Sequence, residues 1–317
     1  IWTDKMPSND DDFWVACEPP AWVDARGPSC CVESEHFVVR WGATGASTDR
    51  AARAAPNILV WLEQVWSLLC DPTSPDFFVV PYSAAGWCDD GLKRKINVYI
   101  GDTGLHPHPH DAGWAHQGTV DEDCPAVGHP RANPRNRLRH SYLALKPGAA
   151  EAERTCVHEF GHVLQLHTGG HVDSECVGYQ WEAHAEYCTH LRNAAWAPHL
   201  PIFLRTAHLP VDMTNYDGEG EGGGRQYIVW PFYAYLDRVY GRGTANSLWH
   251  ADFRQRCANP TGQSHDLITN LVNFCKWEVG GGVDGAAKRP ACLRDLFGGF
   301  ALASLTLDLA CADRAHQ

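Results

Sequence analysis

The segment His158-Glu159-Phe160-Gly161-His162 combines residue types and a spacing that suit metal chemistry. Two histidines four residues apart lie on one face of a helix, so both imidazoles can reach a single metal ion. Glu159, beside the first histidine, can then act as a general base toward a water molecule at that ion. Although the chain holds 18 histidines, chance predicts only roughly 0.04 occurrences of H-E-x-x-H. The pattern therefore predicts a metal-dependent hydrolase, with a helix that simply carries two polar histidines as the alternative.

A third ligand is needed, because a catalytic zinc ion usually has three protein ligands and one open position. Glu182 and Glu186 lie four residues apart, on one face of the next expected helix. We assign Glu182 as the third ligand, and Glu186 as the residue that accepts an N–H from a ligand histidine. The opposite assignment, with Glu186 as the ligand, stays open. His184 points away from this face and is interpreted as a polar surface residue.

These residues resemble the gluzincin metallopeptidases. His162 is followed twenty residues later by Glu182 within W-E-x-x-A-E-Y, and that family places its third ligand in a similar helix. The resemblance implies a zincin-like fold, one catalytic Zn²⁺ ion, and peptide hydrolysis with Glu159 as general base. It extends weakly to 227–236, where Tyr227 stands at the position of the family's oxyanion-stabilising tyrosine. Pro231 interrupts that segment, which leaves other side chains as reserves for this role: Tyr216, Tyr233, Tyr235 and His250.

The sequence departs from the aminopeptidases of that family, which carry a G-x-M-E-N strand that binds the substrate amine. Met6 and Met213 are the only methionines, so this segment is missing here. We therefore expect an endopeptidase that acts on a peptide or protein, through substrate-binding residues that the sequence does not identify. The alternatives are a zinc hydrolase acting on glycosylated peptides or another amide, and a non-catalytic zincin binding module. The chain is also similar to a group of secreted bacterial HEFGH proteins of unknown function, through 34–42, HEFGHVLQ and 296–298.

Composition narrows the partners and the compartment. A net charge of −12 argues against nucleic acid, because phosphate backbones need clustered Lys and Arg. Without an 18-residue apolar run, no membrane span is expected, and the sequence does not give the oligomeric state. The 13 cysteines are dispersed and include no CxxC pair, which predicts a disulfide framework and a secreted protein. A start at Ile1 fits a removed signal segment. The alternative is a cytosolic protein with many buried free cysteines. Because 13 is odd, at least one thiol is free, buried or bonded to another molecule, and Cys156 is the candidate. Cys176 and Cys188 are a candidate pair.

The periodicity predicts an α+β fold, with a small mixed sheet and a long helix, then the active-site helix, then a mainly helical C-terminal part. We expect strands at 36–41, 77–80, 96–100 and 141–145, and helices at 48–70, 150–167, 179–193, 225–240, 244–256 and 264–277. Ser141–Leu145 is the expected edge strand for the substrate backbone, with an inner strand as the alternative.

Three regions complete the expected organisation, as one catalytic unit. Residues 1–35 form an irregular, disulfide-tied arm, 36–170 a zincin α+β subdomain, and 171–317 a helical subdomain that carries Glu182. Within the second region, 102–140 is expected to be a long surface loop. A Ca²⁺ site is a further candidate, because several residues match the start of a calcium loop whose last position is Gln226 instead of Glu; a flexible acidic loop is the alternative. The matching residues are Asn215, Asp217, Glu219 and Gly220.

Overall fold

The structure, a computed structural model, is α+β, as predicted. Two compact units make up the chain: unit 1 comprises Ile1–Asp71 and Val79–His167, and unit 2 comprises Pro72–Phe78 and Thr168–Gln317. The described residues are 14–15, 24–25, 29–81, 93–106, 116–124, 138–168, 180–196, 200–207, 209, 211, 225–250, 271–272, 274–275 and 292–306. Among them, no helix is long and apolar enough to cross a membrane.

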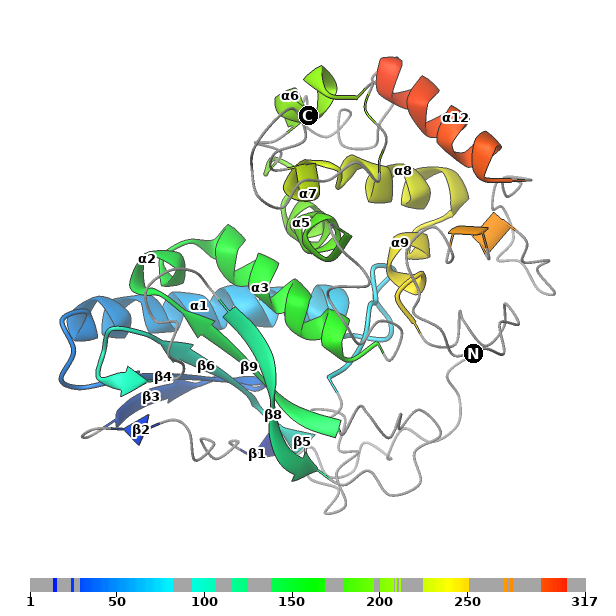
Figure 1. Ribbon diagram of the computed structural model, residues 1–317. Helices are drawn as coiled ribbons and strands as arrows, with labels where there is room; N and C mark the ends of the chain where they lie inside the picture. Colours follow the sequence, from blue (N-terminus) through cyan, green and yellow to red (C-terminus); the bar gives the residue numbers. More distant parts are fainter. Residues whose placement is uncertain are drawn as a thin grey trace. The chain divides into compact units, whose positions relative to one another are not determined.

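Unit 1 is built on a five-stranded mixed sheet with the order β3-β4-β6-β9-β8 (Figure 1). The three inner strands β4, β6 and β9 run parallel, with Val98 pairing with Val39 on one side and Leu143 on the other. The outer strands β3 and β8 are antiparallel to their neighbours. All five residues of β6 are buried, as is usual for a central parallel strand. The strands span Ser29–Glu33 (β3), Phe37–Gly42 (β4), Ile96–Ile100 (β6), His116–Cys124 (β8) and Leu138–Leu145 (β9).

Two short strand pairs accompany this sheet. β1 (Trp14–Val15) runs parallel to β5 (Lys93–Arg94), and β2 (Asp24–Ala25) is antiparallel to β7 (Leu105–His106). The chain from 14 to 33 therefore includes three strands, and β3 belongs to the main sheet, whereas an irregular arm was expected for 1–35.

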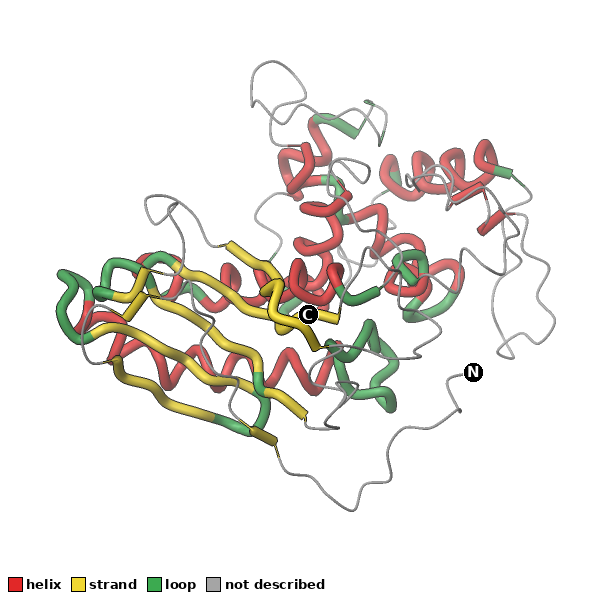
Figure 2. The backbone as a smooth tube through the Cα atoms, turned by 60° about the horizontal axis from the view of Figure 1, so that its bottom comes forward, coloured by secondary structure: helices red, strands yellow, loops and turns green. Residues whose placement is uncertain are grey.

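Helices α1 (Thr48–Leu69) and α3 (Glu153–Leu166) lie side by side on one face of this sheet, and Figure 2 shows the strands and these helices as two layers. The short α2 (Pro147–Ala150) precedes α3 and begins with a proline, which suits the first turn of a helix. The predicted apolar spacing of α1 is confirmed, because Ile58, Leu62 and Val65 are fully buried. This layer positions the H-E-x-x-H helix.

An aromatic cluster joins the sheet, α1 and α3. The ring of Phe160 lies 5.3 Å from that of Phe37 in β4 and 6.4 Å from that of Trp66 in α1. Phe37 and Phe160 are fully buried, and the ring centroids of Phe37 and Trp66 are 5.9 Å apart. Since such aromatic pairs prefer offset or edge-to-face geometries, the cluster orients α3 as well as excluding water.

Unit 2 is helical in its described parts. Its helices are α5 (Gln180–Arg192), α6 (Leu200–Arg205), α7 (Arg225–Ile228), α8 (Pro231–Tyr240), α9 (Thr244–Ser247) and α12 (Leu293–Leu305). They enclose one apolar cluster, to which α5 contributes Ala183 and Tyr187 and α12 contributes Leu296 and Phe300. The predicted order, with the sheet and H-E-x-x-H helix first and a mainly helical part after them, is confirmed.

Three predicted features of the strands are wrong. Residues 77–80 form no strand; Phe78 instead packs in unit 2, where its ring lies 4.8 Å from that of His184. Ser141–Leu145 belongs to β9, an inner strand between β6 and β8, so the alternative interpretation is confirmed. The expected loop at 102–140 contains β7 and β8; the register of β8 shifts between Val120 and Cys124, and its sequence lacks the alternation that marks a strand.

Two predicted helices have different boundaries in the structure. The helix expected at 225–240 is divided into α7 and α8, because Pro231 lacks an amide hydrogen and starts a new helix at its first position. The helix expected at 244–256 is described as α9, which ends at Ser247. Most of 264–277 and the boundary expected at 170 lie outside the described residues, and unit 1 ends at His167.

Candidate functional site

Helix α3 has two faces with different roles. The helical spacing places His158, His162 and Gln165 on one side and Phe160 on the opposite side. Phe160 fixes the helix to the sheet and α1 through the aromatic cluster. The polar side chains on the other face are therefore presented by a helix that apolar packing holds from behind.

The two histidines of α3 face each other closely. Their Nε2 atoms are 3.0 Å apart, and their rings lie edge to face with centroids 4.6 Å apart. Both residues are buried, with 8% of His158 and 3% of His162 exposed. Two ligand nitrogens on a tetrahedral zinc ion are about 3.3 Å apart, given Zn–N distances of about 2.0–2.1 Å. The pair thus fits one small metal ion.

Gln165 orients the second histidine, a role that was not predicted from the sequence. Its Oε1 lies 2.9 Å from Nδ1 of His162, and Gln165 is fully buried. When His162 donates from Nδ1, its Nε2 keeps a lone pair, which is the form that a metal ligand requires. The spacing of three residues along α3 is a signal from which this contact could have been predicted. For His162, Gln165 has the supporting role that the sequence analysis gave to Glu186.

Glu159 and Cys156 lie in the same helix. Glu159 is nearly buried, with 9% of its surface exposed, and a carboxylate is a side chain that can act as a general base. Cys156 is fully buried, and its Sγ lies 3.8 Å from the carbonyl oxygen of Ala149. Burial, together with the charge of Glu159, raises the pKa of the Cys156 thiol to about 12. Cys156 is therefore an inert buried thiol, and its prediction as an unpaired cysteine is confirmed.

His167, at the C-terminal end of α3, is also buried, and burial lowers its pKa to about 3. The imidazole of His167 is therefore neutral across the physiological pH range. It contributes a polar but uncharged cap to this end of the helix.

Helix α5 carries both predicted carboxylates. Glu182 is partly exposed, whereas Glu186 is buried, with its Oε2 3.5 Å from the hydroxyl of Thr189. Within the described part of the chain, His158, His162 and Glu182 form the group of side chains that could hold a metal ion. Two imidazoles and a carboxylate are the ligand set that zinc prefers in hydrolases.

The interpretation of His184 as a surface residue is wrong. Its side chain is completely buried, and its Nε2 lies 3.0 Å from Oδ1 of Asn246. Phe78, Tyr233 and Trp249 surround its ring, with centroids 4.8–5.2 Å away. The hydrogen bond to Asn246 allows this polar side chain to be buried, and the sequence spacing alone could not reveal a partner 62 residues away.

The tyrosines of α7 and α8 differ in accessibility. Tyr227 is 36% exposed on α7, which is not continuous with α8. Tyr233 is buried and donates its hydroxyl hydrogen to Oε1 of Gln180 at 3.1 Å, so it acts within the core of unit 2. Tyr235 is buried too, and its ring contacts Phe300. His250 contacts the ring of Phe78, with centroids 5.9 Å apart.

Part of the disulfide prediction is wrong, because several cysteines have free thiols. Free thiols are found at Cys30, Cys31, Cys156, Cys188, Cys275 and Cys292. The pairing of Cys176 with Cys188 is therefore wrong: Cys188 is fully buried in α5, with its Sγ 4.0 Å from Nδ1 of His184. Any disulfide framework must involve other cysteines, and the expectation of secretion now depends on those.

Several predicted features lie outside the described residues. They are Tyr216, the calcium-loop residues Asn215, Asp217, Glu219 and Gly220, and Cys176.

Comparison with known proteins places the chain in a family. The model of a family of unknown function, DUF6055, matches residues 18–263, and the chain belongs to this family. The matched range includes both α3 and α5. No curated protein matches the chain. The family description assigns no activity, so the chemistry has to be inferred from the residues themselves.

Proposed function

We propose that the protein is a zinc-dependent metallopeptidase of the gluzincin type, with His158, His162 and Glu182 as the metal ligands and Glu159 as the general base. The observation that carries the proposal is the buried pair of histidines on α3, whose Nε2 atoms are 3.0 Å apart while Gln165 contacts His162 Nδ1. Two histidines held in this way, with a glutamate beside the first, suit hydrolysis better than a structural role, because a structural zinc site needs no base.

The chain's own residues would divide the chemical work as follows. A bound zinc ion supplies a Lewis acid that activates water and polarises the substrate carbonyl. Glu159 takes the proton from the attacking water and later delivers it to the leaving nitrogen. Its nearly complete burial strengthens these electrostatic interactions, because little water screens them. Tyr227 is the proposed hydrogen-bond donor to the developing oxyanion.

The substrate would lie along strand β8. This strand is the last in the sheet order on the side of β9, and it packs against α3. A peptide in extended conformation can add to such an edge through backbone hydrogen bonds. β8 therefore replaces Ser141–Leu145 as the candidate for substrate binding, and this mode suits an endopeptidase because neither end of the peptide has to be recognised.

The activity is tested by incubating a denatured protein mixture with the purified protein and mapping the cleavage sites by mass spectrometry. We expect cleavage that a chelator abolishes and Zn²⁺ restores. Glu159→Gln should still bind Zn²⁺ but lose activity by about 10²–10⁴-fold, the usual contribution of a general base. Glu35→Gln, an exposed glutamate, is the matched control and should cleave like the wild type. Equal cleavage by the wild type and Glu159→Gln would exclude this mechanism.

The ligand assignment needs a separate measurement. Glu182→Ala and Glu186→Ala are compared by their zinc content after gel filtration. We expect Glu182→Ala to lose the metal and Glu186→Ala to retain it. If both variants retain Zn²⁺ equally, Glu182 is not a ligand, and if only Glu186→Ala loses it, the opposite assignment is correct.

A further inference from the structure

Helix α5 is held in unit 2 by a face with polar side chains. Gln180, His184 and Tyr187 follow one another at spacings of four and three residues, so they share one side of the helix. We call this set the anchoring face, and all three residues are buried. Each side chain has a hydrogen-bond partner on another helix: Tyr233 of α8 for Gln180, Asn246 of α9 for His184 and Asp237 of α8 for Tyr187.

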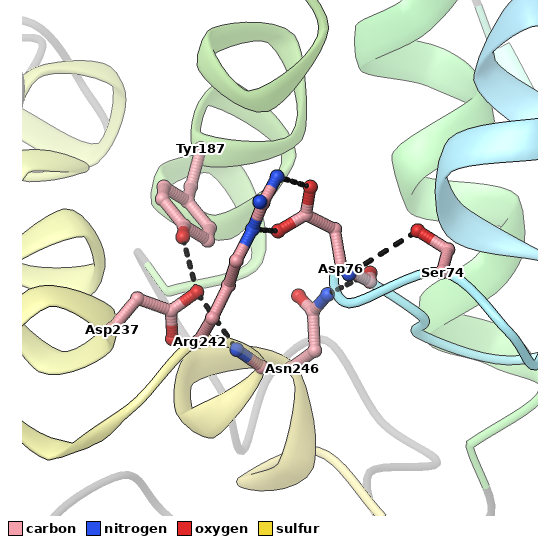
Figure 3. Close-up of polar contacts among 7 residues, drawn as sticks. Ser74, Asp76, Tyr187, Asp237, Arg242 and Asn246 are labelled. Carbon is pink, nitrogen blue, oxygen red and sulfur yellow. Dashed lines mark hydrogen bonds and ion pairs between the residues drawn. The ribbon is translucent and has the colours of Figure 1, made fainter. Parts of the chain in front are cut away.

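Asn246 holds His184 in one orientation. Its Nδ2 donates to the backbone oxygen of Asp76 at 2.7 Å (Figure 3). Its Oδ1 is therefore the atom that faces His184, 3.0 Å from Nε2. His184 therefore donates from Nε2. Asp76 is itself fixed, because its buried carboxylate forms a bidentate ion pair with Arg242. A chain of directional contacts thus runs from Arg242 to α5.

Asp237 holds Tyr187 in a similar way. The hydroxyl of Tyr187 donates to Oδ2 of Asp237 at 2.5 Å, as Figure 3 shows. The same carboxylate accepts backbone N–H hydrogen bonds from Gly243 at 3.1 Å and Ala245 at 2.7 Å. Because both oxygens are occupied, the carboxylate cannot turn, and the ring of Tyr187 has a single favourable position.

The anchoring face is opposite to the face with the carboxylates. Glu182 and Glu186 each lie two residues from His184, which is about 200° around a helix at 100° per residue. A hydrogen-bonded face specifies the rotation of a helix more narrowly than an apolar one, because hydrogen bonds depend on direction. At a helix radius of about 5–6 Å, a rotation of 20° would move a side chain by about 2 Å. Metal–ligand distances tolerate only about 0.2 Å.

We propose that Asn246 and Asp237 are positioning residues: through His184 and Tyr187 they set the rotation of α5 and so direct Glu182 toward the metal. This inference rests on the proposed function. Neither residue contacts the metal. Their contribution is to fix the ligand helix in advance, so that binding does not have to order it.

The test compares Asn246→Leu and Tyr187→Phe with the wild type in full-length protein. Tyr187→Phe keeps the buried ring and removes only the hydroxyl that reaches Asp237. Zn²⁺ affinity is measured by competition with a chromogenic chelator, and the stability of the metal-free protein is measured by thermal unfolding. We expect both variants to bind Zn²⁺ about 10–100-fold more weakly, as is typical when the residues that support metal ligands are removed.

Phe300→Leu provides the control for stability. Phe300 is a buried residue of the same apolar cluster, in α12, and its ring contacts Phe203 and Phe232. This variant should lower the Tm but leave Zn²⁺ affinity unchanged. The visible absorption of the Co²⁺-substituted proteins adds a readout of coordination geometry, which should change in the two anchoring variants alone.

The outcomes separate the two proposals. One outcome overturns the positioning inference alone. In it, the wild type binds Zn²⁺ and Glu182→Ala does not, but the anchoring variants bind Zn²⁺ as tightly as Phe300→Leu, at a similar Tm. If the anchoring variants fail to fold, His184→Gln replaces them in the comparison, because glutamine keeps a hydrogen-bond donor. We expect this variant to fold and to bind Zn²⁺ with an affinity between those of the wild type and of a protein without the contact. Wild-type Zn²⁺ affinity in His184→Gln would count against the inference. A wild type that binds no Zn²⁺ overturns the proposed function and the inference together.

Discussion

Helices α3 and α5 both present acidic or imidazole side chains on one face, but different interactions hold the opposite face of each helix in place. Behind α3 lies an apolar contact, in which Phe160 packs between Phe37 and Trp66. Behind α5 lie hydrogen bonds from His184 and Tyr187 to residues 50 or more positions away. Apolar packing contributes more stability per side chain, whereas hydrogen bonds contribute direction. The two helices should therefore respond differently when their anchors are removed.

The largest effect is expected for Phe160→Ala. Removing a fully buried phenylalanine should lower the free energy of unfolding of unit 1 by about 3–5 kcal/mol, because the cavity adds to the lost apolar burial. Hydrogen exchange measured by mass spectrometry on the metal-free protein can follow the two units separately. A loss under 1 kcal/mol would show that α3 does not depend on this packing.

Arg242→Met should have the next largest effect, on unit 2. It leaves the buried carboxylate of Asp76 without its ion-pair partner, which should lower the free energy of unfolding by about 3 kcal/mol. This is the low end of the usual cost of breaking a buried ion pair, because Arg242 is half exposed and water can reach the carboxylate. The double variant Asp76→Asn with Arg242→Met should recover part of this loss, since no buried charge remains. Chemical denaturation of both variants is the measurement, and a double variant less stable than Arg242→Met would contradict the explanation.

Gln165→Leu should weaken metal binding without lowering stability much. Without the contact to Nδ1, His162 is no longer held in the tautomer that binds a metal, and Zn²⁺ affinity should fall by about 10–100-fold. Gln165→Glu keeps the acceptor oxygen and is the matched control, with affinity near that of the wild type. Chelator competition compares the two, and equal affinities in all three proteins would exclude the role of Gln165.

The smallest effect concerns acid stability and Glu63 of α1. Burial tends to raise the pKa of this carboxyl, but the hydrogen bonds from the backbone and ring of His36, together with the charge of His36, outweigh burial, so the pKa lies below its ordinary value of 4.5. A lowered pKa in the folded state means that the stabilisation is complete above pH 4.5 and is lost as the pH falls through the lower value. Glu63→Gln should be about 1 kcal/mol less stable than the wild type at pH 7. The difference should shrink below pH 4 in thermal unfolding, and a constant difference would show that the charge is irrelevant.

The contrast between α3 and α5 also explains what could be predicted from the sequence. The order of sheet, H-E-x-x-H helix and helical part was predictable, because it follows from apolar periodicity within each segment. His158, Glu159 and His162 were recognisable because they lie within one helical turn. Gln165 could have been found by the same spacing argument. All of these depend on residues that are close in the sequence.

The features that were missed depend on distant residues. His184 was taken for a surface residue because its partner Asn246 follows 62 residues later. Phe78 was assigned to a strand because its apolar neighbours suit one, but its ring packs against His184 and Trp249. β8 was taken for a loop because its sequence lacks alternation, and only the pairing with β9 makes it a strand. Tertiary contacts override local propensity in each case.

The segment Pro72–Phe78 has a consequence for how the protein can be divided. It interrupts unit 1 in the sequence but belongs to unit 2. A truncated protein made of Thr168–Gln317 would lack Asp76, and Arg242 and Asn246 would lose the partners that this segment supplies. During synthesis, these seven residues leave the ribosome long before the helices that receive them. Unit 2 is therefore not separable by one cut in the chain, and a fragment meant to fold alone would have to include this segment through a circular permutation or a graft.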